Sequence, residues 1–270
     1  NSYIARCRRV VYFYWILCVA ICSTIIFGPL VMIQQDEHGN CIYEHIINGF
    51  TPFDNQAPEC YYTLFIEIIA SNIMAFYLVG WNTLVWSIMI FFAGQLKIVQ
   101  LYGMRLIEIG NNKKSHKNVA EFHRFYMSLV EHQKLFNSLI SLSMFLYEVM
   151  TAINLSANII NIVQFSGDTS TLHSLLNSGA CVLGCFIELL MLYWYGSKVG
   201  DESSLVSYAT FSSSWVGADP QVQKEVALLA LTTSKDIVFD AGPFHKMTLA
   251  AFVTILRASY TFFTLISTTK

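Results

Sequence analysis

The end of the chain, Phe252–Lys270, combines an apolar helical pattern with a run of hydroxyl groups. Spacings of three and four residues place the following side chains on or beside one helical face: Thr261, Thr264, Leu265, Thr268 and Thr269. Threonines interrupted by one leucine can line a water path and close it with an apolar ring. The alternative is packing between membrane helices, where Ser and Thr are also common, and spacing alone favours that alternative.

Three ionisable side chains lie inside apolar stretches, namely Glu148, Glu188 and Arg257. A charge in a membrane segment is costly, so each one is by default a hypothesis of function. We expect Arg257 to face a water-filled vestibule or an acidic neighbour. For Glu188 we favour a structural role over a role in ion conduction.

The cysteines fall into two groups. Cys41 and Cys60 belong to an acidic loop, Gln34–Cys60, that has no Lys or Arg. If this loop lies outside the cell, where thiols are oxidised, the two could form a disulfide, although their spacing does not establish it. The other cysteines are typical of buried small hydrophobic side chains. None of them has a His at metal-ligand spacing, so we predict no metal site and no cofactor.

Enzymatic and nucleic-acid-binding functions have little support. The seven histidines are scattered over loops and helix ends without a paired nucleophile, and Gly-rich phosphate loops are absent. The closely spaced Lys113, Lys114 and Lys117 are typical of a solvated turn near anionic lipid. We therefore predict neither an enzyme nor a nucleic-acid-binding protein.

The elements that must position these residues are apolar helices. The chain is 54% hydrophobic and only 13% charged, with a mean hydropathy of +0.49, and its apolar stretches are long enough to cross a bilayer. Five spans are expected, at about 10–33, 61–96, 135–165, 175–196 and 247–269. Sustained strand alternation and internal repeats are absent, so we predict an all-α polytopic membrane protein with one helical domain over 1–270. Because the first residue is Asn, we expect an upstream part to be missing, which makes this number of spans a lower bound.

Basic residues alternate between the connecting segments. All of the 16 Lys and Arg residues except Arg257 and Lys270 lie before the first span, between the second and third, or between the fourth and fifth. The other two loops have none, and the positive-inside rule therefore places the C-terminus outside the cell. Two inner segments, about 97–134 and 219–235, carry apolar residues at the helical period. We expect them to form a cytoplasmic helical bundle, and Asp219 followed by Pro220 is typical of a helix start.

The last third of the chain resembles the C-terminal third of insect odorant receptors. Elements typical of that family occur in the same order: Tyr193–Gly196, Glu202-Ser203, Tyr208 with Trp215, Ala241-Gly242, and Leu256–Tyr260 with Phe263. The stretch VGWNTLVWSI at Val79–Ile88 also looks like the family's fourth span, although Asn82 stands where an Asp is common. The resemblance implies that the five spans are the third to seventh of a seven-helix bundle.

The resemblance also implies a function. Such a chain is the odorant-specific, tuning subunit of a ligand-gated, non-selective cation channel, a heterotetramer with odorant receptor co-receptor subunits in the plasma membrane of olfactory sensory neurons. The last helix would line the pore, and its narrowest positions would be Leu265 and Thr269. The co-receptor is apolar at both positions, so Thr269 departs from it. With the resemblance added, we favour the pore interpretation of the threonine stripe over packing.

An odorant pocket is implied in the outer half of the bundle, between the first, second and fourth spans. Its ligand would be a small, volatile and mostly apolar molecule, held by buried area and a few placed polar groups. The candidate lining residues are Cys18, Cys22, Ile25, Ile26, Ile69, Ile73, Phe76, Tyr77, Cys181, Val182 and Cys185. Each of these residues alone is more typical of plain helix packing.

Two other classes of protein remain open. Gustatory receptors share the topology, but the Ser-Tyr-x-x-Phe ending from Ser259 is closer to the odorant branch. A G-protein-coupled receptor would end inside the cell, whereas this chain is expected to end outside. A transporter would show repeated halves or helices broken at corresponding positions, which the sequence lacks.

Overall fold

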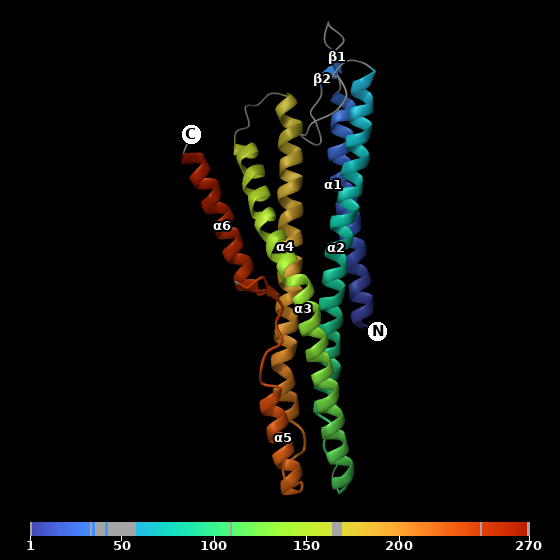
Figure 1. The fold of residues 1–270 in the computed structure, drawn as a ribbon, viewed down its shortest axis with the longest axis vertical. Helices are drawn as coiled ribbons and strands as arrows, with labels where there is room; N and C mark the ends of the chain where they lie inside the picture. Colours follow the sequence, from blue (N-terminus) through green and yellow to red (C-terminus); the bar gives the residue numbers. More distant parts are fainter. Residues whose placement is uncertain are drawn as a thin grey trace. The chain divides into compact units, whose positions relative to one another are not determined.

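The computed structural model describes residues 2–32, 34–35, 41–42, 58–108, 110–163, 169–243 and 245–268. Helices dominate these residues (Figure 1): α1 (Ser2–Met32), α2 (Glu59–Gly103), α3 (Asn112–Val163), α4 (Thr169–Phe211), α5 (Pro220–Thr232) and α6 (Leu249–Thr268). Two short antiparallel pairs connect them. Strand β1 (Gln34–Gln35) pairs with β2 (Cys41–Ile42), and β3 (Asp240–Ala241) pairs with β4 (His245–Lys246).

The long helices follow from the long apolar runs. Among the described residues, α2, α3 and the Leu175–Phe211 part of α4 are each long and apolar enough to cross a membrane. In lipid, a helix satisfies every backbone hydrogen bond within its own segment, so an apolar run of this length has no cheaper conformation. The all-α fold class expected from the sequence is confirmed for the described residues.

Helix α3 begins earlier than the sequence pattern indicates. The sequence indicates a solvated turn at Lys113, Lys114 and Lys117, yet α3 already starts at Asn112. The Asn111 side-chain oxygen accepts a hydrogen bond of 3.0 Å from the backbone N–H of Lys114. This is the bond that an N-cap residue makes to an otherwise unpaired donor of the first turn. The polar residues are therefore the start of a helix.

Helix α5 starts where the sequence predicts it, but without the expected side-chain cap. Pro220 is its first residue, and the missing N–H of proline costs nothing at that position. The Asp219 side chain makes no capping hydrogen bond, and its backbone oxygen instead accepts from the Gln223 N–H at 3.0 Å.

The chain divides into two compact units. The first unit holds Asn1–Ile4, Val85–Ile153 and Leu189–Tyr260, and the second holds Ala5–Leu84, Asn154–Glu188 and Thr261–Lys270. Helices α2, α3 and α4 each contribute a segment to both units.

An aromatic cluster lies in the core of the first unit. Phe239 is fully buried, and its ring centroid lies 5.7 Å from that of Phe92 on α2 and 5.8 Å from that of Phe136 on α3. Both pairs have edge-on geometry, which aromatic rings prefer over a face-to-face sandwich. The cluster therefore fastens the segment after α5 to both helices.

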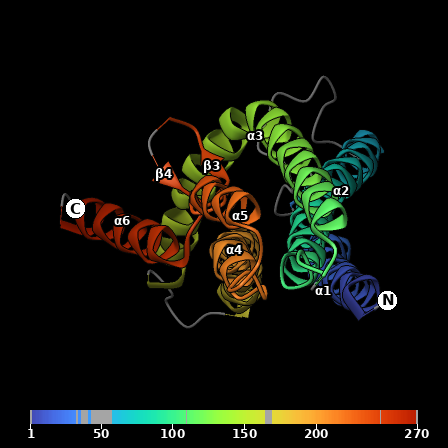
Figure 2. The same cartoon turned by 90° about the horizontal axis from the view of Figure 1, so that it is seen from below.

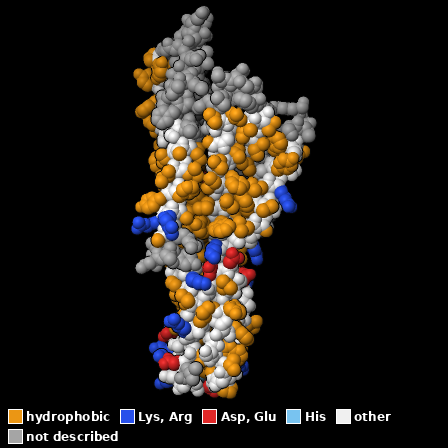
Figure 3. All heavy atoms as spheres, turned by 180° about the vertical axis from the view of Figure 1, so that it is seen from behind, with side chains coloured by type: hydrophobic (Ala, Val, Ile, Leu, Met, Phe, Trp, Pro, Cys, Tyr) orange, Lys and Arg blue, Asp and Glu red, His pale blue; other side chains and the backbone are white. Residues whose placement is uncertain are grey.

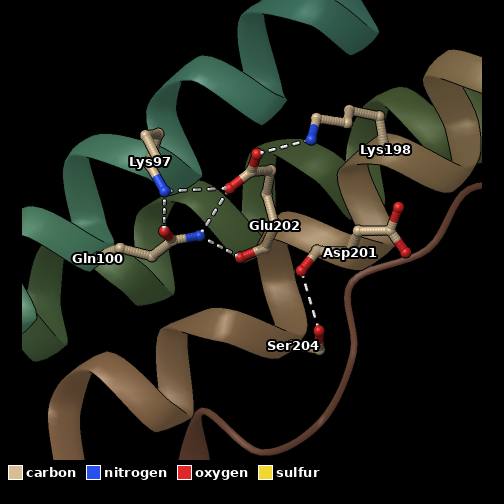
Figure 4. A network of polar contacts seen from close by, with 6 residues as sticks. All are labelled: Lys97, Gln100, Lys198, Asp201, Glu202 and Ser204. Carbon is tan, nitrogen blue, oxygen red and sulfur yellow. Dashed lines mark hydrogen bonds and ion pairs between the residues drawn. The ribbon is translucent and has the colours of Figure 1, made fainter. Parts of the chain in front are cut away.

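A buried carboxylate joins α2 to α4 in the same unit (Figure 4). The Gln100 side-chain N–H group donates to the backbone oxygen of Glu202 at 2.7 Å and to its Oε2 at 2.9 Å. Lys198 Nζ lies 3.1 Å from Glu202 Oε1, and Lys97 Nζ lies 3.8 Å from Oε2. The hydrogen bonds from Gln100 and the two lysine charges thus stabilise the charged form of this buried carboxylate. On the face drawn in Figure 3, hydrophobic side chains cover a broad area, and charged side chains are grouped in other parts of the face.

Candidate functional site

An apolar pocket of about 300 Å³ opens in the second unit. Its lining comes from one face of α1 and one face of α2: Trp15, Cys18, Val19, Cys22, Ser23, Asn72, Ala75, Phe76 and Val79. The rings of Trp15 and Phe76 pack at a centroid distance of 5.8 Å, so the two helices meet through an aromatic pair. A pocket of this size and composition suits a small apolar ligand.

Two polar side chains take part in the lining, and both bond to their own helix. Ser23 Oγ donates to the backbone oxygen of Ala20 at 2.6 Å. The Asn72 side-chain N–H group donates to the backbone oxygen of Ile68 at 2.8 Å. The hydrogen bonds that these two side chains donate therefore stay within α1 and within α2 and do not join the two helices.

A buried polar cluster lies one helical turn from the pocket along both of its helices. Tyr14, four residues before Cys18, donates a short hydrogen bond to Glu188 Oε1 of α4. Asn82, three residues after Val79, donates to the Tyr14 hydroxyl oxygen at 3.3 Å. Tyr14 is 2% exposed and Asn82 is 3% exposed. A carboxylate in an apolar setting requires such partners, which agrees with a structural role for Glu188.

The predicted pocket residues are only partly brought together. Cys18, Cys22 and Phe76 line the pocket. Ile69, Ile73 and Tyr77 are exposed and do not line it. The remaining candidates do not line this pocket, and two of their side chains lie outside the described part of the chain. Three of them are half-buried on α4, namely Cys181, Val182 and Cys185. The other two are Ile25 and Ile26, whose side chains the structure does not describe.

The lining residues that sequence reasoning missed follow a helical period. On α2 they occur at three- and four-residue steps around Phe76, as Asn72, Ala75 and Val79. The expected set on that helix was centred on Ile69 and Ile73, one residue out of phase with the true face. Each residue turns a helix by about 100°, so a shift of one position selects a different face. The period around Phe76 was the signal that could have found them.

A second notable region, which we call the docked segment, is Ile237–Thr248 between α5 and α6. Figure 2 shows β3 and β4 of this segment beside α3. The α3 residues that contact the segment are spaced by about one helical turn: Gln133, Asn137, Ser141, Phe145 and Glu148. Along this row the bonds come in order. Gln133 donates to Val238 O at 2.9 Å, Asn137 Oδ1 accepts from Asp240 N at 2.7 Å, and Ser141 O accepts from Gly242 N at 2.8 Å.

Two glycines allow the docked segment to approach the helices closely. Gly242 has a φ of 63°, and an added Cβ there would lie 2.9 Å from Phe145 Cβ on α3. Beneath the other end of the segment lies Gly196 of α4, where an added Cβ would lie 2.8 Å from Met247 O. A side chain at either position would push the segment off its helix.

A cluster of three polar side chains lies near the end of the docked segment that leads to α6: Glu148, Tyr193 and His245. The Tyr193 hydroxyl donates to Glu148 Oε1 at 2.5 Å, and His245 Nε2 lies 2.9 Å from Glu148 Oε2. His245 Nε2 also lies 2.9 Å from the Tyr193 hydroxyl. The trio joins α3, α4 and β4. Strand β4 ends at Lys246, three positions before the first residue of α6. Glu148, 3% exposed, is thus a junction between elements of the first unit.

The last helix carries the hydroxyl stripe. Thr261 and Leu265 are exposed, Leu265 by 59%, and Thr264 Oγ1 donates to Thr261 O at 2.8 Å. Arg257 is also exposed. The Thr268 side chain and the whole of Thr269 lie outside the described residues. The pore assignment of these residues stays a prediction.

The expected disulfide is described at one end only. Cys60 is disulfide-bonded and fully buried at the start of α2. The side chain of Cys41 lies outside the described residues, so the pairing of Cys41 with Cys60 stays a prediction.

Relatives of known sequence are insect receptors. Odorant receptor 10 of Aedes albopictus is 32% identical over 79 residues, which cover 29% of this chain and 21% of that protein. Odorant receptor 33b of Drosophila melanogaster is 26% identical over 175 residues, which cover 62% of this chain and 45% of that protein. The matched segments therefore span less than half the length of these relatives.

Solved structures show the same fold. The insect olfactory receptor OR5 from Machilis hrabei, in complex with eugenol, superposes with a TM-score of 0.83 at 14% identity, covering 100% of this chain and 68% of that chain. The same receptor in the structure described without eugenol gives a TM-score of 0.84, also at 14% identity, over 98% of this chain and 66% of that chain. The model of the 7tm odorant receptor family matches residues 1–260, and the protein therefore belongs to this family.

Proposed function

We propose that this chain is the odorant-binding subunit of a ligand-gated, non-selective cation channel that assembles with odorant receptor co-receptor subunits. The observation that carries the proposal is the apolar pocket of about 300 Å³ between α1 and α2, in a chain of the odorant receptor family. The multi-pass helices favour the plasma membrane, and the family favours that of olfactory sensory neurons, with the C-terminus outside the cell.

The chemistry of the pocket supports a volatile, mostly apolar ligand. A ligand that buries roughly 200 Å² of apolar surface gains about 5 kcal/mol from leaving water. Part of this gain is lost to the entropy of association. Affinity of this order suits a receptor that must release its odorant again.

The pore is proposed to run along α6, with Leu265 and Thr269 at its narrowest part and Thr261, Thr264 and Thr268 on the same wall. The 59% exposure of Leu265 within the single chain supports a helix that has neighbours in an assembly. Hydroxyls on such a wall replace part of the water around a passing ion, and one leucine ring closes the path when it dewets.

The docked segment is proposed to couple the helical bundle to α6. It is bonded to α3 by Gln133 and Asn137, and α6 begins directly after it. A displacement of α3 or α4 in the first unit therefore pulls on the start of the pore helix.

The test uses the native thiols of the pocket. Cells expressing the full-length protein with the co-receptor are screened for odorant-evoked current and then treated with methyl methanethiosulfonate, a small thiol-specific reagent. Because Cys18 and Cys22 line the pocket, the reagent should abolish most of the current, and odorant applied beforehand should protect it. The double variant Cys18→Ser/Cys22→Ser should respond to odorant and resist the reagent.

The matched control is Cys181→Ser/Cys185→Ser, which removes a second pair of thiols one turn apart outside the lining and should remain sensitive to the reagent. Equal inhibition of the receptor that lacks Cys18 and Cys22 would contradict the pocket assignment. A current that needs no co-receptor would contradict the assembly with co-receptor subunits. A current that stops when G-protein signalling is blocked would contradict the channel assignment.

A further inference from the structure

The two polar side chains of the pocket wall each donate one hydrogen bond within their own helix. Asn72 donates its side-chain N–H to Ile68 O, and Ser23 donates its hydroxyl proton to Ala20 O. A backbone carbonyl oxygen accepts hydrogen bonds and never donates them. The orientation of the Asn72 amide is therefore dictated by its partner, because only the nitrogen can face Ile68 O.

What remains for a ligand at these positions is the acceptor capacity of both side chains and the second N–H of the Asn72 amide. A side-chain amide oxygen has two lone pairs, and no hydrogen bond from a described residue reaches Asn72 Oδ1. Ser23 Oγ likewise keeps its lone pairs. Asn72 lies on α2 and Ser23 on α1, so both walls of the pocket present an acceptor.

The other lining side chains add one strong donor. The Trp15 indole carries an N–H group, which can only donate, while its ring packs on Phe76. Cys18 and Cys22 have weakly donating thiols, and the rest of the lining is hydrocarbon. A ligand group that both donates and accepts is the one that fits this set.

We propose that the pocket selects small apolar alcohols and phenols over ethers, esters and ketones of the same carbon skeleton, because Asn72 presents a hydrogen-bond acceptor to the ligand. This inference rests on the proposed function of the pocket. A hydroxyl group donates to Asn72 Oδ1 and still accepts. An ether or a carbonyl group only accepts, and it displaces water from the Asn72 oxygen without replacing the lost hydrogen bond. Such an unpaired polar group lowers affinity by about tenfold or more.

The experiment compares ligands that differ in one group. Odorant-evoked current is measured with the full-length protein and the co-receptor for phenol against anisole, for benzyl alcohol against benzyl methyl ether and benzyl acetate, and for straight-chain alcohols against their methyl ethers. We expect the hydroxylated member of each active series to have a half-maximal concentration at least about tenfold lower than its ether. Equal potency, or greater potency of the ethers and esters, would overturn the inference.

The variant Asn72→Leu keeps the approximate side-chain volume and removes the acceptor. It should reduce the preference for the alcohol over its ether to within about threefold, mainly by weakening the response to the alcohol. Asn158→Leu is the matched control: Asn158 also donates to the backbone oxygen four residues earlier, Asn154 O at 2.9 Å, but it is half-buried on α3 and does not line the pocket. The control should keep the full preference, and an unchanged preference in Asn72→Leu would overturn the inference.

The ratio of the half-maximal concentrations of alcohol and ether is measured in the unmodified receptor, without any variant. The inference therefore remains testable even if Asn72→Leu fails to reach the membrane. Failure of the proposed function looks different: no odorant of any class then evokes a co-receptor-dependent current sensitive to modification of Cys18 and Cys22. If current occurs but does not distinguish hydroxyl from ether, the proposed function stands and only the ligand class falls.

Discussion

The pocket and the docked segment satisfy their polar groups in opposite ways. In the pocket wall, Ser23 and Asn72 bond to the backbone of their own helix, three and four residues away. The docked segment is instead bonded to Gln133 and Asn137 of α3, which lie more than 100 positions away in the chain. A locally satisfied wall can exchange its contents without breaking tertiary structure, whereas bonds between elements make the docked segment move with its helices.

This difference suits the two roles that we propose. A binding site for volatile molecules needs an apolar face whose few polar groups donate within their own helices, so that emptying the pocket breaks no hydrogen bond between helices. A coupling element needs ties that hold only in one relative position of the helices. Mutations in the docked segment should therefore act on stability, and mutations in the pocket wall should act on ligand response.

The largest effect is expected from Glu148→Ala. The change leaves the Tyr193 hydroxyl and His245 without their shared carboxylate in a buried position, and removal of one partner from such a cluster typically costs about 3 to 5 kcal/mol. The measurement is the thermal unfolding of the purified channel in detergent. Glu131→Ala, an exposed carboxylate on the same helix, is the control and should unfold within a degree or two of the unmodified protein. Unfolding of the two variants at the same temperature would mean that the buried trio does not anchor the segment.

A smaller loss is expected from Gly196→Ala, because the new methyl group would meet Met247 O at 2.8 Å. Overpacking of this kind typically costs about 1 to 3 kcal/mol. The matched control lies on the same helix: Gly179→Ala finds nothing within 4 Å of the added Cβ and should stabilise the protein by roughly 0.5 to 1 kcal/mol through helix propensity. Opposite signs in the same unfolding assay would sharpen the contrast, and equal signs would remove the evidence that Met247 is held against α4.

The smallest effect on stability is expected from Ser23→Ala in the pocket wall. Its bond to Ala20 is local and exposed, so the unfolding free energy should change by less than about 0.5 kcal/mol. The response to an activating odorant should nevertheless shift by a few-fold, because the pocket surface has changed. Ser143→Ala removes a bond of the same kind, to Ile140 O at 2.8 Å on α3, and should alter neither quantity. A stability loss as large as that of Gly196→Ala would break the comparison between the two regions.

Much of the fold could be predicted from the sequence because lipid leaves an apolar run few alternatives. The segment Tyr61–Leu96 has to be helical in a membrane whatever it packs against. The pocket candidates came instead from the family resemblance, and of these Cys18, Cys22 and Phe76 line the pocket. They did not include Asn72 and Ala75, because hydrophobicity in a span does not reveal which face meets a neighbour.

The sequence by itself determined which stretches are helices and where charges are excluded, since these follow from the local cost of placing polar groups in hydrocarbon. It also marked Glu148 and Glu188 as residues that require partners. Only the tertiary structure decided what those partners are: Tyr193 and His245 for the first, Tyr14 for the second. The physical reason is that a hydrogen bond between distant residues depends on the rotation and register of two helices, and those are set by side-chain packing that no single stretch of sequence contains.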